Sequence, residues 1–579
     1  METATKTENI ERMKYTTEKN ISGAEIMVRS LIQEGVDNMF GYIGGAIMPV
    51  YDALYDYQDE LKHFMSRHEQ GAMHSAQAYA RISKKVGVCF TTSGPGATNV
   101  ITGLADAYLD STPLVVITGQ VGSGLLGTDA FQETNIVGVS MPVTKWNYQI
   151  TRADEIAEIM AKAFYIARSG RPGPVLIDIT KNAQILKADY HYKKCEGIRS
   201  YQPMPKLNKT EIEAAAALIN SAKKPLLLAG QGILLSGAED ELLEFVEKTQ
   251  VPVACTLLGL SAFPTNHPLY VGMLGMHGNY APNMNTNECD VLIAVGMRFD
   301  DRVTGDTSKY ARQAKIIHID IDRSEHNKNI VVDVPVLADA KDALKALNKV
   351  VSGEYRTAWM KSFKDYYQIE FDKVIKKQAY AKSDQINMAE VIRILSEQTK
   401  GEAVLCTDVG QHQMTSARYY GFKRPNTQIT SGGLGTMGFG LPAAIGAQVG
   451  DRNATVVSVS GDGGFQMTLQ ELAVIKQYHL PVKAILLNNS FLGMVRQWQD
   501  LFFDQRFSNT QLENPDFVKI VEGYGIQAKR VSSRDDLETA IQEMLDSPEA
   551  YFLEVVVETE SNVLPMIAPG AAVSDMRLE

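Results

Sequence analysis

The sequence predicts an α/β protein built from three doubly wound parallel-sheet domains. Three stretches of the chain alternate short apolar runs with longer amphipathic segments, which is typical of strands and helices that form parallel sheets. A chain of 579 residues, 45% of them hydrophobic, has enough apolar material for several ordinary domains. We expect domains at 20–185, 207–351 and 387–560, followed by a C-terminal tail at 561–579.

Each domain has its own predicted strands. In the first domain they are the runs VGVCFTTS, LVVITG and GPVLIDI. In the second they are KPLLLAG, PVACTLL, DVLIAVG and KIIHIDI, and the third contains VVSVSG and VKAILLNN. Helical stretches such as ATNVITGLADAYL separate these runs. Two polar or charged stretches, KADYHYKKCEGIRSYQPMPK and SGEYRTAWMKSFKDYYQIEFDK, are interpreted as connections between the domains.

The composition argues against several classes of protein. A net charge of −11 without a basic stripe argues against nucleic-acid binding. The five cysteines contain no CxxC pair, which indicates a reducing compartment and no zinc site. No apolar run reaches membrane-spanning length. The first twenty residues are polar and contain several glutamates, so they resemble neither a secretory signal nor a transit peptide. We therefore expect a cytoplasmic protein without membrane partners.

The stretch VVSVSGDGGFQMT, residues 456–468, places an aspartate at the end of a buried-looking strand. Asp-Gly is a common hairpin signal, but no second strand returns here. Thr468 and Glu471 have the spacing of a capping box, and apolar residues recur at helical intervals from Leu469. The stretch therefore predicts a strand, a glycine-rich loop at Asp462 and then a helix.

A second apolar strand, at about 482–487, ends in Asn488 and Asn489. A strand, a helix and another strand form a right-handed unit whose parallel strands end at one edge of the sheet. Asp462 and Asn489 should therefore lie close together at the edge where such sheets bind ligands. A carboxylate and an amide oxygen beside glycines suit Mg²⁺ that carries a diphosphate. The alternative is a turn without a ligand.

The glycines at 433–438 give a competing signal. GGLGTMG contains a literal G-x-G-x-x-G, followed by a helix and by the strand that ends at Asp462, which almost satisfies a dinucleotide fingerprint. However, the preceding strand is short, Pro442 lies early in the helix and the acid is flanked by glycines. A dinucleotide also needs no second oxygen donor at Asn489. Nicotinamide binding is therefore the weaker interpretation.

Two motifs of the first domain allow both a structural and a functional interpretation. In HFMSRHEQGA, Glu69 follows a strand at the start of a helix, where an acid commonly stabilises the helix N-terminus. TTSGPGATNV follows another strand and opens a helix at Ala97. Its backbone NH groups could hold an anion or simply form a tight turn.

The middle domain contains a charged cluster. GMRFDDRVTG places Arg298 and Arg302 around Asp300, directly after a strand. These arginines form either a solvated salt-bridge cluster or a grip on phosphate or carboxylate. The run IDID ends in Asp320 and Asp322, which either bind a ribose or terminate a strand. Together with the glycines of AGQGIL, these residues suggest a nucleotide-type ligand.

This constellation resembles the thiamine-diphosphate (ThDP) enzymes, whose signature is GDG followed downstream by NN. More specifically, the chain resembles catalytic subunits of acetohydroxyacid synthase, and the likeness extends from about Ile21 to PMIAPGA near the C-terminus. The motifs that carry it are RHEQGA, TSGPGATN, LGTDAFQE, RPGPVLIDITK, GMLGMHG, RFDDRVTG, DVGQHQM, SGGLGTMGFGLPAAIGA and GMVRQWQ. The resemblance implies pyrimidine-binding, FAD-binding and diphosphate-binding domains in that order. RFDDR indicates the flavin-containing biosynthetic type.

The resemblance also implies a role for each candidate residue. Glu69 would hydrogen-bond N1′ of the aminopyrimidine, where a carboxyl group favours the imino tautomer. The Mg²⁺ ligands would be Asp462, Asn489 and the backbone carbonyl of Phe491. The ThDP contacts would be Val409, Gly410, Gln411, His412, Gly435, Met437, Gly461, Gly463 and Gly464. The FAD contacts would be Arg171, Met276, His277, Gly278, Arg298, Asp300, Asp320 and Asp322. The substrate contacts would be Phe131, Gln132, Lys181, Arg302, Met494 and Trp498.

The reaction implied is decarboxylation of pyruvate on ThDP and addition of the hydroxyethyl unit to a second 2-ketoacid. Pyruvate would give 2-acetolactate and 2-ketobutyrate would give 2-aceto-2-hydroxybutyrate, the first common step of valine, leucine and isoleucine biosynthesis. Arg302 would hold the carboxylate of the second ketoacid. Trp498, with Met494 beside it, would favour the extra methyl group of 2-ketobutyrate, which an apolar pocket rewards by roughly 1–3 kcal/mol. The flavin would be structural because the reaction is redox-neutral.

The resemblance further implies partners. In the family, the residue that corresponds to Glu69 reaches a cofactor held by the other chain, so a homodimer or homotetramer is expected. The family usually takes a separate small regulatory subunit. Ile43, Gly122 and Thr415 depart from the usual residues of the family, but they remove no predicted catalytic group.

Two other functions remain as alternatives. The first is a different ThDP enzyme, such as a pyruvate oxidase or a ketoacid decarboxylase; Arg302 and Trp498 argue against a decarboxylase, which needs no grip on a second acceptor. The second is a non-catalytic paralogue kept as a binding or regulatory protein. The intact Glu69, Asp462 and Asn489 argue against that.

Overall fold

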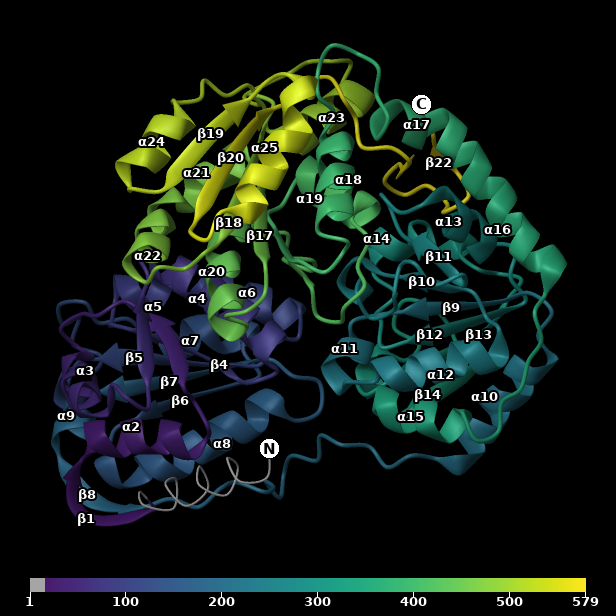
Figure 1. Ribbon diagram of the computed structural model, residues 1–579. Coiled ribbons are helices and arrows are strands. Elements are labelled where there is room, and N and C mark those ends of the chain that lie inside the picture. Colours follow the sequence, from purple (N-terminus) through teal and green to yellow (C-terminus); the bar gives the residue numbers. More distant parts are fainter. Residues whose placement is uncertain (1–15) are drawn as a thin grey trace. The chain divides into compact units, whose positions relative to one another are not determined.

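The computed structural model describes residues 16–579 and contains three six-stranded sheets, which confirms the predicted fold class (Figure 1). Every strand pair within these three sheets is parallel. The prediction made for the first twenty residues falls mostly on 1–15, outside the described residues. No helix within residues 16–579 is long and apolar enough to cross a membrane.

The chain divides into two compact units. Unit 1 comprises the described part of Met1–Pro203 with Gly433–Asn453 and Thr468–Pro481. Unit 2 comprises Met204–Gly432, Ala454–Met467 and Val482–Glu579. The first predicted domain therefore folds together with two segments of the third, while the rest of the third shares a unit with the middle domain.

The sheet of unit 1 has the strand order β3-β2-β4-β5-β7-β6. Its strands are β2 (Asn38–Gly41), β3 (Lys62–Met65), β4 (Gly87–Thr91), β5 (Leu114–Gln120), β6 (Trp146–Ile150) and β7 (Pro174–Thr180). All residues of β5 and β7 are buried, because helices cover both faces of a parallel sheet and its central strands become continuously apolar. A separate antiparallel pair joins β1 (Thr17–Ser22) to β8 (Lys187–His191).

Helices of two sequence regions belong to unit 1. From the N-terminal region these are α2 (Gly23–Gln33), α3 (Met48–Leu54), η2 (Tyr55–Tyr57), α4 (Glu69–Ser83), α5 (Pro95–Asn99), α6 (Ile101–Leu109), η3 (Ser123–Leu125), α7 (Ile136–Ser140), η4 (Met141–Val143), η5 (Ala153–Glu155), α8 (Ile156–Arg168) and α9 (Lys181–Ile185). From the later segments they are α20 (Gly440–Gly450), η10 (Leu469–Glu471) and α22 (Leu472–Gln477).

Helices α4 and α20 of unit 1 pack with almost no space between their backbones. A Cβ atom built on Gly446 of α20 would lie 1.8 Å from the carbonyl oxygen of Ser75 on α4. Ser75 in turn donates its hydroxyl to the carbonyl oxygen of Pro442, at 2.8 Å. This close packing explains why α20 joins the N-terminal region rather than the sheet that follows it in sequence.

The first sheet of unit 2 is formed by the middle of the chain, with the order β11-β10-β9-β12-β13-β14. Its strands are β9 (Pro225–Ala229), β10 (Val253–Cys255), β11 (Tyr270–Met273), β12 (Val291–Val295), β13 (Lys315–Asp320) and β14 (Val334–Leu337). Counted from its first strand, this order is 3-2-1-4-5-6, which is the doubly wound order of dinucleotide-binding domains. The strand order reverses between β9 and β12.

The second sheet of unit 2 has the order β16-β15-β17-β18-β20-β19. Its strands are β15 (Val404–Thr407), β16 (Gln428–Thr430), β17 (Val456–Gly461), β18 (Lys483–Asn488), β19 (Gln527–Val531) and β20 (Tyr551–Val556). In sequence order this is 2-1-3-4-6-5, the same order as the sheet of unit 1. The two sheets therefore share a topology that no short-period sequence repeat reveals.

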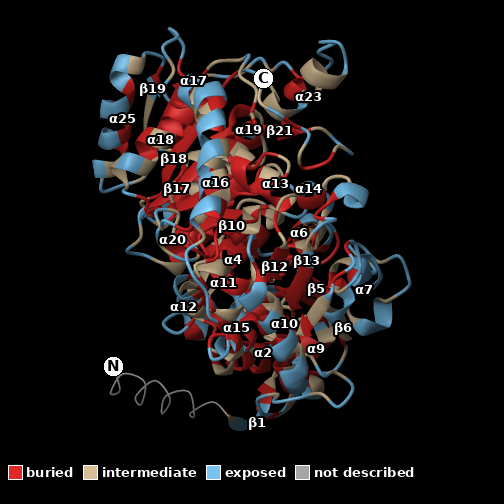
Figure 2. Cartoon of the chain, turned by 90° about the vertical axis from the view of Figure 1, so that its right-hand side faces the viewer, coloured by how far each residue is buried: buried red, intermediate tan, exposed pale blue. Residues whose placement is uncertain are grey.

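The helices of unit 2 surround these two sheets, whose strands are largely buried (Figure 2). Around the middle sheet they are α10 (Lys209–Ser221), α11 (Gly232–Ser236), α12 (Glu239–Thr249), η6 (Leu257–Gly259), α13 (Tyr280–Thr286), α14 (Asp301–Thr304), η7 (Thr307–Lys309), η8 (Arg323–Glu325) and α15 (Ala340–Leu347). The following helices are α16 (Thr357–Glu370), the π-helix η9 (Phe371–Ile375), α17 (Lys376–Gln378), α18 (Met388–Gln398), α19 (Gln411–Tyr419), α21 (Asp462–Thr468), α23 (Gly493–Phe502), α24 (Phe517–Gly523) and α25 (Arg534–Asp546). The C-terminal segment contains a short antiparallel pair, β21 (Met566–Ile567) and β22 (Met576–Arg577).

The structure corrects two local predictions at 456–471. The expected glycine-rich loop does not exist, because helix α21 begins at Asp462 itself. The expected capping box is also wrong. The hydroxyl of Thr468 donates to the carbonyl oxygen of Gly438, at 2.9 Å, and Glu471 accepts from backbone groups near residue 67. Both side chains find partners that are distant in sequence, which spacing alone cannot reveal.

We predict that Gly446→Ala destabilises the protein by about 1–3 kcal/mol, the usual effect of overpacking. The added methyl group meets the backbone of α4, which cannot move as a flexible side chain would. The change is measured by denaturant-induced unfolding. Gly523→Ala is the control, since Gly523 also lies in a helix, as the last residue of α24, but no atom lies within 4 Å of its Cβ position. Equal stability of the two variants would contradict the close α4–α20 packing.

Candidate active site

The carboxyl ends of β17 and β18 form one edge of the second sheet of unit 2. The strands pair in parallel with Gly461 opposite Leu487. Asp462 follows the first strand directly, and Asn489 follows the second after Asn488. The two candidate cation ligands are therefore at the same sheet edge, where doubly wound sheets bind ligands.

Asp462 is a buried carboxylate in a polar setting. Its Oδ2 accepts a hydrogen bond from Nδ2 of Asn514 at 2.7 Å, and its Oδ1 accepts from the backbone NH of Gly463 at 3.2 Å. Burial raises the pKa of Asp462 to about 6 despite these donors. The same Asn514 amide donates to Oδ1 of Asn488 at 3.0 Å. Asn514 thus ties the ends of β17 and β18 together.

Asn489 presents its amide to the same region. Its Oδ1 accepts from the backbone NH of Phe491 at 3.2 Å, and its Nδ2 donates to Oε1 of Gln411 at 3.4 Å. Within residues 16–579 no group of three or more His, Cys, Asp or Glu side chains is arranged to hold a metal ion. The candidate set contains only one such residue, Asp462, with amide and backbone oxygens for the rest. Oxygen-only donors of this kind fit Mg²⁺, which is usually completed by phosphate and water.

The start of α19 lies beside the glycines of β17 and α21. A Cβ atom on Gly461 would lie 2.8 Å from Nδ1 of His412, and one on Gly464 would lie 2.7 Å from Oδ1 of Asp408. His412 is buried, burial lowers its pKa to about 3, and its Nε2 has no hydrogen-bond partner. A neutral imidazole with an unpaired buried nitrogen fits a site that receives a polar ligand. The segment between Asp408 and His412 contains the candidates Val409, Gly410 and Gln411. Gly463 lies in the first turn of α21.

The middle-domain candidates fall into two groups within unit 2. In the first, the carbonyl oxygen of Arg302 accepts from the backbone NH of Met276 at 2.7 Å, and the Arg302 guanidinium lies 3.8 Å from the Met276 sulfur. His277 is buried, and its Nδ1 has no hydrogen-bond partner. The buried pair Arg418–Glu370 supports this segment, since Arg418 donates to the carbonyl oxygens of residues 277 and 278.

In the second group the acidic residues also have local structural roles. Asp300 caps α14 by accepting from the backbone NH of Arg302 at 3.0 Å, and Asp322 caps η8 by accepting from Ser324 at 2.9 Å. Asp320 accepts from the backbone NH of Asp322 at 2.8 Å. Arg298 lies 3.8 Å from Asp300. These residues therefore form the local salt-bridge and capping contacts that the sequence allowed, and any contact with a ligand would be additional to them.

The glycines of AGQGIL serve packing rather than ligand binding. The NH of Gly230 donates to the carbonyl oxygen of Val295 and that of Gly232 to the carbonyl oxygen of Gly296. A Cβ atom on Gly230 would lie 2.1 Å from the latter oxygen. These glycines allow β9 and β12 to approach at the point where the strand order reverses.

The substrate candidates Met494 and Trp498 lie on α23. They are four residues apart and therefore share one face of the helix. Both are half-buried, and the Trp498 ring packs edge-on against Phe502 with 5.6 Å between ring centroids. The face of α23 that they form belongs to unit 2, as does Arg302.

Unit 1 contains the other candidate carboxylate. Glu69 is half-buried as the first residue of α4, and its Oε2 accepts from Nδ2 of Asn99 at 2.9 Å. Oε1 would lie 3.2 Å from a Cβ atom on Gly96. The motifs RHEQGA and TSGPGATN therefore meet at the Glu69 carboxylate. Sequence analysis identified both motifs but not the contact between Glu69 and Asn99.

The remaining candidates of unit 1 are on loops or at the starts of elements. Gln132 packs closely on Gly94 of the TSGPG turn. A Cβ atom added to Gly94 would lie 2.9 Å from the carbonyl oxygen of Gln132. Phe131 beside it is 87% exposed. Lys181 is exposed at the start of α9. Arg171 donates to the hydroxyl of Ser111 at 2.9 Å. It belongs to unit 1, whereas the other FAD candidates belong to unit 2.

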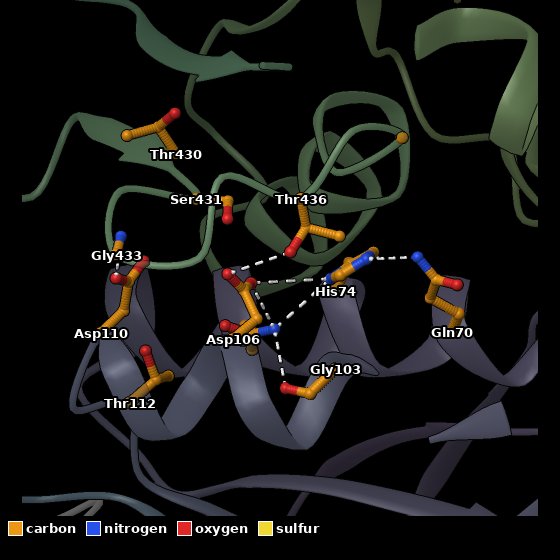
Figure 3. Close-up of polar contacts among 12 residues, drawn as sticks. Gln70, His74, Gly103, Asp106, Asp110, Thr112, Thr430, Ser431, Gly433 and Thr436 are labelled. Atoms are coloured by element: carbon orange, nitrogen blue, oxygen red, sulfur yellow. Dashed lines mark hydrogen bonds and ion pairs between the residues drawn. The ribbon is translucent and has the colours of Figure 1, made fainter. Parts of the chain in front are cut away.

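The loop 433–438 is held by two buried carboxylates at the end of α6 (Figure 3). The NH of Gly433 donates to Oδ1 of Asp110 at 2.6 Å, and the hydroxyl of Thr436 lies 3.4 Å from Oδ1 of Asp106. Asp110 also pairs with Arg81 at 2.9 Å. Because the Gly433 NH is already bonded to a carboxylate, the loop does not offer it to a phosphate. The structure therefore disfavours the dinucleotide fingerprint here.

Gly435 and Met437 are on the same loop. Gly435 adopts a φ of +70° and Gly438 one of +85°, a region that favours glycine. Gly435 is exposed and Met437 is half-buried. The contacts with Asp106 and Asp110 at the end of α6 therefore hold the backbone around Gly435 and Met437 in place.

Sequence analysis missed several residues that shape the site. Asn514 and Asp110 have no local signal, because each contacts a segment far away in the sequence. Glu471 was assigned to the wrong partner. Asn99 lies within TSGPGATN, but its contact with Glu69 depends on how the starts of two helices approach each other, so no local signal identifies it.

Residues 21–139, 212–347 and 408–555 match the N-terminal TPP binding, central and C-terminal TPP binding domains of thiamine pyrophosphate enzymes, respectively. The chain is 44% identical over 569 residues to a "Probable acetolactate synthase large subunit" of Methanocaldococcus jannaschii, covering 96% of this chain and 95% of that one. It is 45% identical over 557 residues to the "Acetolactate synthase isozyme 2 large subunit" of Escherichia coli, covering 96% and 99%. It is 45% identical over 585 residues to "Acetolactate synthase 2, chloroplastic" of Nicotiana tabacum, covering 98% and 86%.

We predict that Asn514→Ala weakens divalent-cation binding roughly 10-fold, the low end of what partners behind a metal ligand contribute. Asp462 loses the amide that orients its carboxylate, and Asn488 loses the same donor. Binding is titrated with Mn²⁺ as a paramagnetic probe. Asn453→Ala, at an exposed position, is the control. Unchanged Mn²⁺ affinity in Asn514→Ala would contradict the assigned role.

Proposed function

The chain belongs to the thiamine pyrophosphate enzymes and, within them, to the acetolactate synthase large subunits, and on that premise we propose that it is an acetohydroxyacid synthase. It would decarboxylate pyruvate and transfer the two-carbon unit to a second 2-ketoacid. The observation that carries the proposal is the 44–45% identity over 96–98% of the chain to relatives with that name. None of these three relatives is named for a competing activity, that of a pyruvate oxidase or ketoacid decarboxylase.

The proposed cofactor of the first step is ThDP with Mg²⁺. ThDP supplies the carbanion chemistry, while the protein supplies geometry and electrostatics. The unpaired Nε2 of His412 and the crowded Gly461 and Gly464 support a diphosphate beside α19. Asp462, Asn489 and the carbonyl of Phe491 would hold Mg²⁺. The remaining contacts would be Val409, Gly410, Gln411 and Gly463 to the diphosphate, and Gly435 and Met437 to the aminopyrimidine.

Glu69 would hold a proton at N1′ of the aminopyrimidine. Its anchoring by Asn99 at 2.9 Å supports this role, because the contact orients one carboxylate oxygen and leaves the other for the ligand. A positioned carboxyl group of this kind is a usual general acid or base. In the family the ring belongs to the cofactor of the other chain, so the role requires an oligomer.

The second ketoacid would be held in unit 2. The Arg302 side chain is 61% exposed and weakly paired, at 3.7 Å from Asp301, so it remains available for a carboxylate. Met494 and Trp498 would form the apolar surface that favours 2-ketobutyrate. Phe131, Gln132 and Lys181 would line the substrate channel.

We also propose a structural FAD in the middle domain. The strand order 3-2-1-4-5-6 and the unpaired buried Nδ1 of His277 support it. Met276, His277, Gly278, Arg298, Asp300, Asp320 and Asp322 would contact it, with Arg171 from the first domain. Within unit 2, the Arg418–Glu370 pair would keep residues 276–278 in place.

Further expectations concern assembly and location. The large exposed apolar side chains of the first domain, such as Tyr55 (75%) and Phe131 (87%), support a homodimer or homotetramer. The term "large subunit" in the names of relatives supports a separate small regulatory subunit. Five free cysteines support the cytoplasm. The domain bounds 20–185, 207–351, 387–560 and the tail 561–579 remain our proposal.

We predict that the purified protein converts pyruvate to acetolactate when Mg²⁺ and ThDP are supplied, and that product formation depends on added FAD. The products are assayed as acetolactate, acetaldehyde and acetate in parallel reactions. Acetaldehyde or acetate as the main product would mean that the acceptor site around Arg302 and Trp498 is misassigned.

We predict that Glu69→Gln lowers turnover by more than about 100-fold, the range of general acid–base catalysis, while Mg²⁺ and ThDP still bind. The amide keeps the contact with Asn99 possible but cannot transfer a proton. Cofactor binding is followed by fluorescence quenching and turnover by acetolactate formation. Glu60→Gln, at an exposed position, is the control. Near-normal turnover of Glu69→Gln would refute the role.

A further inference from the structure

The carboxylate of Glu471 connects two segments of unit 1 that are far apart in the sequence. Glu471 is fully buried at the end of η10. Its Oε1 accepts from the backbone NH groups of Arg67 and His68, each at 3.0 Å, and its Oε2 accepts from Arg67 at 3.2 Å. These two NH groups belong to the turn that immediately precedes α4. The side chain therefore acts on the start of that helix.

Arg67 and His68, the two residues before Glu69, are both held by side-chain contacts. The imidazole Nδ1 of His68 accepts from the backbone NH of Gln70 at 3.1 Å and caps α4. The guanidinium of Arg67 donates to the carbonyl oxygen of Met65 at 2.7 Å and to Gln477 of α22 at 2.6 Å. The direction of the Glu69 side chain follows from the backbone angles of this turn. Glu471 holds both NH groups that determine them.

The glycine of RHEQGA gives independent support for this arrangement. A Cβ atom on Gly71 would lie 2.6 Å from Oε1 of Glu471 and 2.8 Å from its carboxyl carbon. Any other residue at 71 would displace the carboxylate from the turn. The lack of a side chain at Gly71 is thus a condition for the contact between Glu471 and the start of α4.

We propose that Glu471 is a positioning residue for Glu69, holding the turn at which α4 begins and adding a second negative charge beside the Glu69 carboxylate. The inference rests on the role proposed for Glu69 in ThDP activation. Glu471 is therefore assigned no contact with substrate or cofactor. It acts through the backbone of Arg67 and His68.

The charge of Glu471 changes close to neutral pH. Burial, with a smaller contribution from the charge of Glu69, raises its pKa to about 7, although the two backbone NH groups and the Arg67 guanidinium oppose the shift. Because the folded pKa exceeds the ordinary value of 4.5, the contribution of this group to stability is complete below pH 4.5 and is lost as pH rises through about 7. The ionised carboxylate nevertheless makes the stronger, charge-assisted hydrogen bonds to the turn. We therefore expect turnover to rise as Glu471 ionises.

The test compares four variants of the full-length protein: Glu471→Gln, Glu471→Asp, Gly71→Ala and Glu34→Gln. Glu34 is the matched control, since it is a buried carboxylate of unit 1 that pairs with Arg168 instead. The first readout is amide hydrogen exchange, by mass spectrometry, of peptides that cover residues 66–72 in protein without cofactors. The second is the pH dependence of acetolactate formation in the presence of ThDP, Mg²⁺ and FAD.

We expect exchange at 66–72 to accelerate in Glu471→Gln and Gly71→Ala but not in Glu34→Gln. Turnover of Glu471→Gln should fall roughly 10-fold, as for other partners behind a reacting group, with unchanged half-saturation by ThDP. The activity of the wild type should fall as the pH drops below about 7, and Glu471→Gln should not show this fall. Glu471→Asp, which keeps the carboxylate, should still show the fall in activity at low pH.

Four results would overturn the inference. Exchange at 66–72 in Glu471→Gln that equals the control would remove its structural basis. A pH profile in Glu471→Gln identical to that of the wild type would reduce Glu471 to a structural residue. Full turnover of Glu69→Gln would overturn the role of Glu69 and this inference with it. An inactive Glu69→Gln combined with a wild-type-like Glu471→Gln would overturn this inference alone and leave the proposed function intact.

Discussion

The parallel pairing of strands is the constraint on which every candidate site of this protein depends. In each of the three sheets all strands run in one direction, so the loops that follow them collect at one edge. Glu69 follows β3, Asp462 follows β17 and Asn489 follows β18. An antiparallel pair would separate Asp462 from Asn489 by the length of a strand. The chemistry of the candidate site is therefore a consequence of topology before it is one of side chains.

Buried carboxylates that bind backbone NH groups of distant segments are the second common feature. Asp110 holds Gly433, and Glu471 holds the turn at Arg67 and His68. An ionised acceptor gives such a contact roughly twice the strength of a neutral one, and leaving the NH groups unpaired would cost about 1–3 kcal/mol each. These contacts fix loops that carry candidate residues, which packing of apolar side chains alone does not orient.

Much of the fold and part of the site were predictable from the sequence. Apolar runs gave the parallel strands because both faces of a central strand are covered, and the strand after Pro481 was placed within one residue of β18. The placement of Asp462 and Asn489 at one edge followed from strand direction alone. The contact of Glu69 with Asn99 did not follow, because it depends on how two helix starts approach each other. Asn514 was invisible for the same reason.

The sequence by itself determined the class of elements, their order and the chemical character of the strand ends, since these depend on local periodicity and residue type. The tertiary structure decided which partners the polar side chains choose. Thr468 and Glu471 have the spacing of a capping box, yet each bonds to a backbone group from another segment. The local partner and the distant one present the same chemistry, and only the packed fold, which brings α4 and η10 together, determines which of them lies within hydrogen-bonding distance.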